Sequence, residues 1–527
     1  MKTEKINSIC RFFGIFLVLL YTLLMITRSD ELVNSDASFL WNRMCQVVDC
    51  FKDGIYPFLY YNDFEKVGYG SSIFYGQLTL FPFIPIALQG ESQFITSYFM
   101  IACFLNYFGA YSLAKRFTKY HDVIGFLYLS SPLMFMLLLC TQLYPCYMGV
   151  GLGLFFLASC IDIFRDNKSS YKAVLFFILL FNTHLITTLV CFIICVFICM
   201  YYFDKTRIKN YFKFFCLSVF ISLYNIFNYI IHIRSLRGES SYFDFYSDKY
   251  AIFVLSNFPF KDLIFYEYPS NTLFLGTLVL LCWIFVFFKY KVSKKERFIH
   301  IILLSGIVVG VKPLWSLLCS YCNIPIQFPI RYLPFIAVFL LILVLRRFKS
   351  LFLMYSLVFV SLISVCVSSL TISPQESSTL TYDGNDSFIY VGNGEYLSKN
   401  FIFNYDTFKK YSSTVIGDDN NTYSYKLDKN KLIVDLSNNT SKTITVPKLY
   451  YNGYVAEDSS GGRLKCSEGY SMFTEIDVDG FNGELQVYYK QPIYLVLLLI
   501  IDYLLGFVLV VLTFKHANII SDFHYTK

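Results

Sequence analysis

The stretch "GFNGELQVYYKQPIYLVLLL" (residues 480–499) decides the fold, because two kinds of structure meet within it. Its first half alternates polar and apolar residues after two glycines, which is the pattern of a β-strand with one buried face. Beyond Pro492 the chain continues as an apolar run, 493–514, that is long enough to cross a bilayer. A strand that leads almost directly into a membrane helix predicts a β-rich domain held at the membrane surface.

Residues 371–492, upstream of that helix, are predicted to form the β-rich domain. They are rich in Asn, Ser, Thr, Tyr, Gly and Asp. Apolar and polar residues alternate in four short runs: "KLIVDL" (431–436), "KTITVP" (442–447), "FTEIDVDGF" (473–481) and "ELQVYY" (484–489). A period of two between turn residues favours a small β-sandwich. "DVDG" (477–480) lacks the spacing of a calcium loop and is interpreted as the turn of a hairpin.

The rest of the chain is predicted to lie largely in a membrane. Of the 527 residues of the whole chain, 56% are hydrophobic and only 15% are charged, and a soluble protein could not bury so much apolar surface. Spanning helices need about 20 mostly apolar residues, and about twelve segments approach this length. They are 10–27, 92–114, 122–140, 142–163, 172–187, 188–203, 213–232, 272–289, 298–314, 331–346, 351–370 and 493–514. Segment 73–90 contains Pro82 and Pro85, so a re-entrant or interfacial structure is expected there.

Clusters of basic residues set the predicted orientation. Cytoplasmic loops are enriched in Lys and Arg, and five such clusters separate apolar runs, at 114–121, 164–172, 204–213, 289–298 and 346–349. Both termini are therefore expected in the cytoplasm, with the first apolar run kept as a helix rather than removed as a signal peptide. The net charge of +7 follows from this topology and does not indicate a nucleic-acid partner. The segments left outside are 28–91, 232–271, 312–331 and 371–492.

The predicted architecture is thus a polytopic α-helical protein of the plasma membrane in three parts. These are a transmembrane domain (1–370), an extracytoplasmic β-sandwich (371–492), and a final helix with a cytoplasmic tail (493–527). In the first outer segment a helix is expected from about 37 to 51, with Ser35 or Asp36 as its N-cap. The pairs Cys45–Cys50 and Cys319–Cys322 are each close enough in sequence for a disulfide, and the sequence leaves their state open.

The order of several motifs resembles that of a family of large bacterial membrane proteins related to the C-type (GT-C) glycosyltransferases. That family carries a misleading label that refers to 6-pyruvoyl-tetrahydropterin synthase. The motifs are "SDASFLWNR" (35–43) with "DGIYPFLYYNDFEKVGYGSSIFYGQLTLFPFIP" (53–85), "NTHLITT" (182–188), "IPIQFPIRYLPF" (324–335), "GNGEYLS" (392–398) and "VPKLYYNGYVA" (446–456). One segment departs from the family: "CTQLYPCYMGVGL" (140–152) lacks the Arg-Gly and Glu expected after the third span.

The resemblance implies a transferase that works outside the cytoplasm with a polyprenyl-phosphate-linked sugar as donor. GT-C enzymes use an acidic residue of the first outer loop, and Asp36 matches that position, so the role of general base falls to it. His184 and Glu395 lie in matching motifs and are expected to line the site. The leaving lipid phosphate needs cations on the same face, and we expect Arg331 and Lys312, at outer helix ends, to bind it. Arg234 and Arg237 also lie at such ends, where snorkelling to lipid headgroups is the favoured explanation.

Alternative functions remain open at this stage. The acceptor would be an envelope glycan or lipid, and a divalent metal (Mg²⁺ or Mn²⁺) is optional, with no residues assigned to it. A transporter or flippase for a lipid-linked substrate would need polar groups along a path through the bilayer, and few are present. A non-catalytic scaffold for envelope assembly would be compatible with the departure at 140–152. No P-loop is present, which disfavours ATP-driven transport by this chain alone.

Overall fold

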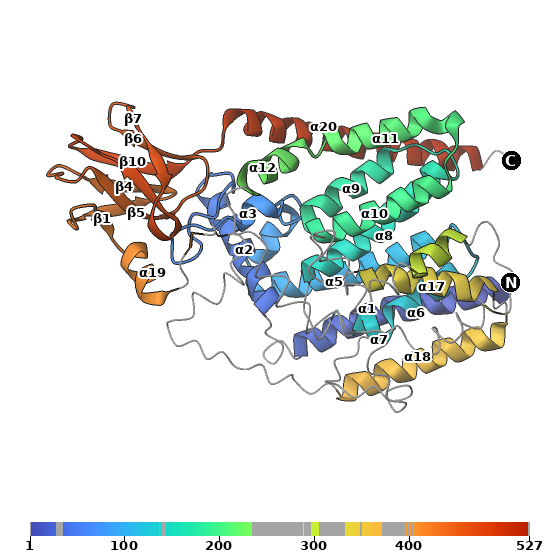
Figure 1. Ribbon diagram of the computed structural model, residues 1–527. Coiled ribbons are helices and arrows are strands. Elements are labelled where there is room, and N and C mark those ends of the chain that lie inside the picture. Colours follow the sequence, from blue (N-terminus) through green and yellow to red (C-terminus); the bar gives the residue numbers. More distant parts are fainter. Residues whose placement is uncertain are drawn as a thin grey trace.

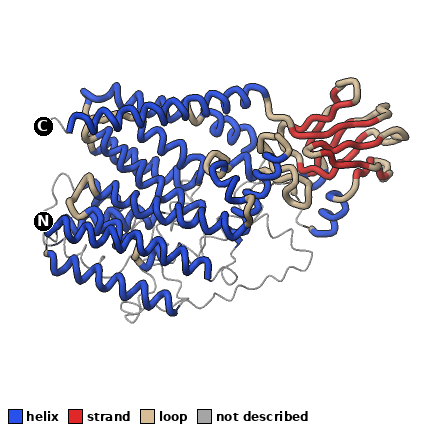
Figure 2. Tube along the Cα trace, turned by 180° about the vertical axis from the view of Figure 1, so that it is seen from behind, coloured by secondary structure: helices blue, strands red, loops and turns tan. Residues whose placement is uncertain are grey.

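The computed structural model describes residues 2–27, 35–135, 138, 144–233, 288, 297–304, 332–347, 350–371, 397, 400–401 and 404–524. A bundle of long helices forms one body, and a β domain lies at one end of it (Figure 1). We call this end of the bundle the domain end. Helix α1 (Lys2–Thr27) begins, and helix α20 (Ile493–His524) ends, at the opposite end of the bundle (Figure 1, Figure 2).

Several helices are suited to cross a membrane. In the part of the chain that the structure describes, four single helices are long and apolar enough: α1, α5 (Glu91–Ala114), α8 (Tyr144–Phe164) and α20. Helices α17 (Leu333–Arg347) and α18 (Leu351–Thr371) match two further predicted segments. The segment 272–289 and most of 298–314 lie outside the described residues. Several helices of the described structure could thus span a membrane, which fits the predicted membrane protein.

The apolar stretch 172–203 forms two short helices, which confirms the predicted division near "NTHLITT". Helix α9 (Tyr171–Thr183) ends at His184, and α10 (Leu185–Tyr201) begins directly after it. His184 has extended backbone angles (φ −156°, ψ 106°), and its ring accepts a hydrogen bond from the amide of Thr187. A histidine that caps the second helix thus ends the first, because the chain cannot continue one helix through an extended residue.

Two predicted spans are not single straight helices, which corrects the prediction. Segment 213–232 divides into α11 (Ile208–Phe220) and α12 (Leu223–Ile233), with a bend of 53° between the two parts. Segment 122–140 begins as α6 (His121–Leu129) and resumes as the single turn α7 (Pro132–Phe135). Pro132 explains the break between α6 and α7, because the residue before a proline avoids the helical conformation.

Helices α5 and α8 pack closely at the centre of the bundle. A Cβ atom on Gly109 of α5 would lie 2.7 Å from the carbonyl oxygen of Gly151 on α8, so no larger residue fits between the two backbones. Small residues at a helix crossing are how membrane helices approach each other. The Asn106 side-chain amide donates a hydrogen bond of 2.8 Å to the Tyr147 carbonyl across the same crossing. The central crossing is thus fixed by close packing and by one buried hydrogen bond.

The segment 35–91 folds as one longer helix and several short ones at the domain end. Helix α2 (Ser35–Lys52) is followed by a loop and by α3 (Ser71–Phe74), η1 (Phe81–Phe83) and α4 (Ile84–Ala87). Pro82 and Pro85 each occupy a first-turn position of a short helix, where a proline is tolerated. The prediction that 73–90 does not form a straight span is confirmed.

The β domain consists of two five-stranded antiparallel sheets that share one hydrophobic core. The strand orders are β2-β1-β5-β9-β8 and β3-β4-β10-β6-β7. The strands are β1 (Val415–Gly417), β2 (Thr422–Tyr423), β3 (Tyr425–Asp428), β4 (Lys431–Asp435), β5 (Thr443–Leu449), β6 (Tyr454–Asp458), β7 (Arg463–Leu464), β8 (Cys466–Glu468), β9 (Phe473–Asp477) and β10 (Glu484–Tyr489). A short helix, α19 (Tyr405–Ser412), precedes them. The predicted β-sandwich is confirmed, and α20 begins four residue positions after β10 ends.

The turn at "DVDG" differs from the prediction. Strands β9 and β10, on either side of it, belong to different sheets and do not pair. The segment is therefore the crossing between the two layers and not a hairpin.

Candidate functional site

Helix α2 places Asp36 and Arg43 on one rigid element at the domain end. The helix predicted from about 37 to 51 is confirmed, but it begins at Ser35, so Ser35 and Asp36 lie in its first turn and neither is the N-cap that was predicted. Leu40, Met44 and Val47 recur at helical spacing and are buried, and α2 contacts α4, α5 and α8. Asp36 lies in the first turn, and Arg43 follows about two turns later, or about 10 Å along the axis.

Arg43 is a buried cation with no counter-ion among the described residues. Only 2% of its surface is exposed. Its guanidinium carbon lies 4.7 Å from the centre of the Tyr75 ring and 5.9 Å from that of Phe39. Within the described part of the chain it makes no ion pair, the Tyr60 hydroxyl is a polar neighbour, and the Arg43 Nε atom is buried without a partner. Since an arginine stays charged and presents five donors, such a group is costly unless an anion reaches it.

Tyrosine hydroxyls and amide groups surround this guanidinium. The phenol of Tyr60 is buried, and its hydroxyl faces the Arg43 and Gln77 side chains without a hydrogen bond of good geometry to either. Burial raises the pKa of Tyr60, while the nearby positive charge of Arg43 acts in the opposite direction. Gln46, one turn further along α2, also has a buried carbonyl oxygen without a partner. The region around Arg43 thus holds more polar groups than the described residues satisfy, which is typical of a ligand site.

The structure brings His184 to the same region. The Tyr75 ring, which covers the Arg43 guanidinium, has its centre 6.2 Å from that of the His184 ring. The Nδ1 atom of His184 lies 3.2 Å from the Thr187 amide nitrogen and 2.8 Å from the Thr187 hydroxyl. Because Nδ1 accepts from the amide, the ring proton belongs on Nε2. Arg43, Tyr75 and His184 therefore form a row from α2 to the junction of α9 and α10.

The loop after α2 is held against that helix by a buried carboxyl group. The side-chain amide of Asn42 donates to Asp63 Oδ1 at 2.7 Å, and the backbone amide of Phe64 donates to the same oxygen at 2.8 Å. Burial raises the pKa of Asp63 despite these two hydrogen bonds. Phe64, Glu65 and Lys66 then adopt positive φ angles of 52°, 53° and 67°, which are uncommon for residues other than glycine. Such a conformation persists only where its surroundings impose it.

The β domain imposes this loop conformation. Lys448 of β5 is 2% exposed, and its ammonium nitrogen donates to the backbone carbonyls of Tyr61 and Lys66. Burial lowers the pKa of Lys448 to about 7, and the positive charge of Lys66 contributes. The Tyr451 hydroxyl accepts a hydrogen bond of 2.9 Å from the amide of Gly70, where a Cβ atom would lie 2.5 Å from the Tyr451 ring. The β domain therefore fixes the loop that supplies Tyr60 and Tyr75 to the site.

The other predicted site residues can be placed only in part. Asp36 belongs to α2, and its backbone alone is described. Arg331, Lys312 and Glu395 lie outside the described residues, as do Arg234 and Arg237. Their proposed roles stay predictions. Cys45 and Cys50 are free thiols, so no disulfide joins them in the structure.

No group of three or more His, Cys, Asp or Glu side chains gathers to hold a metal ion in the described ranges.

No protein-family model matches the chain, and searches of curated proteins and of solved structures return no match. The resemblance to GT-C enzymes therefore rests on the sequence motifs alone.

Arg43 was not among the residues predicted to bind phosphate. The prediction sought cations at outer helix ends, whereas Arg43 belongs to an amphipathic helix within the first outer segment. One signal in the sequence was available. In "SDASFLWNR" the arginine follows Asp36 at a spacing of seven residues, which places the two about two turns apart in a helix.

Proposed function

We propose that the chain is a membrane glycosyltransferase that passes a sugar from a polyprenyl-phosphate carrier to an acceptor of the cell envelope. In this proposal about twelve helices span the membrane, both termini are cytoplasmic, and the domain end faces away from the cytoplasm. The acceptor is a glycan or a lipid. A carrier in the membrane is required there, because nucleotide sugars are confined to the cytoplasm.

The observation that carries the proposal is the buried guanidinium of Arg43 without a counter-ion in the described structure. A planar guanidinium matches the oxygen atoms of a phosphate and binds them in pairs. The Tyr75 ring packs against this group. Lys312 and Arg331 remain proposed as further phosphate ligands.

The proposed reaction is a single displacement at the anomeric carbon. Asp36 accepts the proton of the acceptor hydroxyl while its oxygen forms the new bond to that carbon. The bond from the same carbon to the phosphate oxygen breaks, and the lipid phosphate leaves with the electron pair. Arg43 stabilises the charge that develops on this phosphate. General base catalysis, the role of Asp36, typically raises the reaction rate by about 10²–10⁴-fold. The configuration at the anomeric carbon is inverted.

The test is sugar transfer in membranes that contain the full chain and labelled polyprenyl-phosphate sugars. Wild type is compared with Asp36→Asn and Arg43→Lys at equal expression, and with Arg463→Lys as a matched control. Arg463 pairs with Glu457 on the exposed surface of the β domain, so its replacement should leave transfer unchanged. Loss of product with Asp36→Asn and with Arg43→Lys supports the proposal. Equal turnover in all four rejects it, and movement of lipid-linked sugar across vesicles without transfer would instead identify a transporter.

A further inference from the structure

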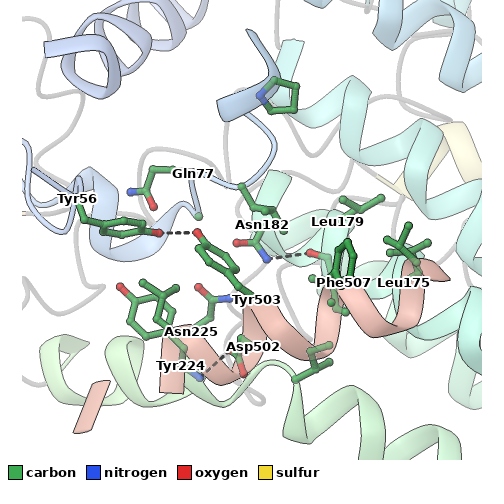
Figure 3. A pocket seen from close by; sticks show the side chains of 18 of the residues that line it. Tyr56, Gln77, Leu175, Leu179, Asn182, Tyr224, Asn225, Asp502, Tyr503 and Phe507 are labelled. Carbon is green, nitrogen blue, oxygen red and sulfur yellow. Dashed lines mark hydrogen bonds between the residues drawn. The ribbon is translucent and has the colours of Figure 1, made fainter. Parts of the chain in front are cut away.

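A cavity of about 350 Å³ lies between the loop after α2, helix α9, the junction of α11 and α12, and helix α20 (Figure 3). This volume is within the range of small-molecule sites, about 300–1,000 Å³. Arg43 does not line it, so it is a separate place from the site described above. Apolar side chains form one part of its wall: Leu175, Ile178, Leu179, Leu499 and Val510.

Asp502 contributes an unsatisfied carboxyl oxygen to this cavity. The residue is 8% exposed, and its Oδ2 atom accepts a hydrogen bond of 3.2 Å from the Tyr224 amide. That amide belongs to the first turn of α12, where the bend after α11 leaves amide groups without helical partners. The Oδ1 atom is buried, and it has no hydrogen-bond partner in the described structure.

No positively charged side chain among the described residues of the cavity wall pairs with this carboxyl group. Lys, Arg and His are absent from the described residues that line the cavity. Two hydroxyls of the cavity wall, those of Tyr56 and Tyr503, lie 2.6 Å apart and share one hydrogen bond. The buried Oδ1 atom of Asp502 therefore has no donor from the described residues, and leaving it without one is costly.

Four aromatic residues line the same cavity. Tyr56, Tyr224, Tyr503 and Phe507 all line the cavity, and Figure 3 shows Tyr224 beside Asp502. Aromatic faces attract cations, and several rings with one carboxylate form the usual recognition site for an ammonium group. The apolar wall, in turn, suits a hydrocarbon chain attached to that ammonium.

We propose that this cavity binds an ammonium group carried on a hydrocarbon chain, with Asp502 as its counter-ion. The ammonium donates to Asp502 Oδ1 and lies against the aromatic rings, and the chain lies along α9 and α20. The inference does not depend on the proposed transferase reaction. An amino-headgroup lipid and a free long-chain amine share this chemistry, and both are included in the test.

The first measurement compares two probes on the purified wild-type chain. Decylamine and decanol have the same chain length and differ in charge, and their binding is followed by native mass spectrometry of the chain in detergent. We expect decylamine to bind at least tenfold more tightly than decanol. Equal binding of the two probes, or no binding of decylamine, overturns the proposal without the need for any variant.

The second measurement uses Asp502→Asn, which keeps an acceptor for the Tyr224 amide and removes the charge. Decylamine affinity should fall at least tenfold while decanol affinity is unchanged. Leu504→Ala is the matched control, because Leu504 is exposed on the same helix and does not line the cavity. Unchanged decylamine binding in Asp502→Asn overturns the proposal. Phosphatidylethanolamine that copurifies with wild type and not with Asp502→Asn identifies a lipid as the source, whereas binding of added amine alone identifies a free amine.

Discussion

Replacement of Arg43 by Met separates a ligand-binding role of this residue from a structural one. Met has a similar length and no charge, and it packs well against the rings of Tyr75 and Phe39. Replacing a buried ion pair by apolar residues of similar volume is often neutral or stabilises a protein by about 1–4 kcal/mol, and a buried charge without a counter-ion destabilises the folded state further. The lost cation–π contacts offset this by about 0.5–2 kcal/mol. Because Arg43 has no counter-ion among the described residues, we expect Arg43→Met to raise the free energy of unfolding by about 1–2 kcal/mol.

Two assays on the purified chain test this expectation. The apparent unfolding temperature in detergent, at one fixed scan rate, should rise by a few degrees in Arg43→Met, while sugar transfer falls at least tenfold. Polyprenyl phosphate should raise that temperature in wild type and not in the variant, because a ligand stabilises only the state that binds it. Arg463→Met, at an exposed surface pair, should change stability by less than about 0.5 kcal/mol. A lower unfolding temperature in Arg43→Met, with activity that follows the folded fraction, would refute the reasoning.

Three further predictions follow from other parts of the structure. Asp36→Asn should reduce sugar transfer by about 10²–10⁴-fold at an unchanged unfolding temperature, and a smaller loss in a labelled-donor assay would remove Asp36 as the base. Lys448 has a pKa lowered by burial to about 7, so the unfolded state binds more protons above that pH, and stability should rise as pH rises from about 7 toward about 10. In Lys448→Met, the stability measured by thermal unfolding should rise less between these pH values. An equal rise in wild type and variant would contradict the lowered pKa of Lys448. Gly151→Ala should lower the free energy of unfolding by about 1–3 kcal/mol, because its Cβ atom would lie 2.7 Å from the backbone of Leu105. Thermal unfolding measures this, and an unchanged stability would show that α5 and α8 can move apart.

The features that the sequence predicted well are encoded locally. Alternation within 431–436 and 484–489 is a property of neighbouring residues, and β4 and β10 form there. The first helix of the outer segment could be placed because a Ser-Asp pair precedes an amphipathic run. The break at His184 could be placed because one long helix would have put a basic cluster on the wrong side of the membrane.

The features that were missed depend on contacts between distant residues. Nothing within "FTEIDVDGF" shows that β9 and β10 join different sheets, since their partners β5 and β4 lie elsewhere in the chain. The bend before Leu223 involves neither proline nor glycine, and it is accompanied by a hydrogen bond from Tyr224 to Asp502 of the last helix. Arg43 could not be singled out either, because the sequence does not show that its neighbours are aromatic rings rather than carboxylates.

The β domain supports the loop that holds Tyr60 near Arg43. A loop with three successive residues at positive φ would not keep its shape alone, so Tyr60 would not hold a fixed place near Arg43. Lys448 binds the carbonyl of Tyr61, which precedes those residues, and that of Lys66, the last of them, and the Glu65 carboxylate pairs with Lys409 of α19 at 3.1 Å. The short link from β10 to α20 keeps the domain at this end of the bundle. Weakening the domain–loop contacts, for instance with Lys448→Met, should therefore reduce transfer more than the loss of a distant surface pair would, because the wall around Arg43 loses its support.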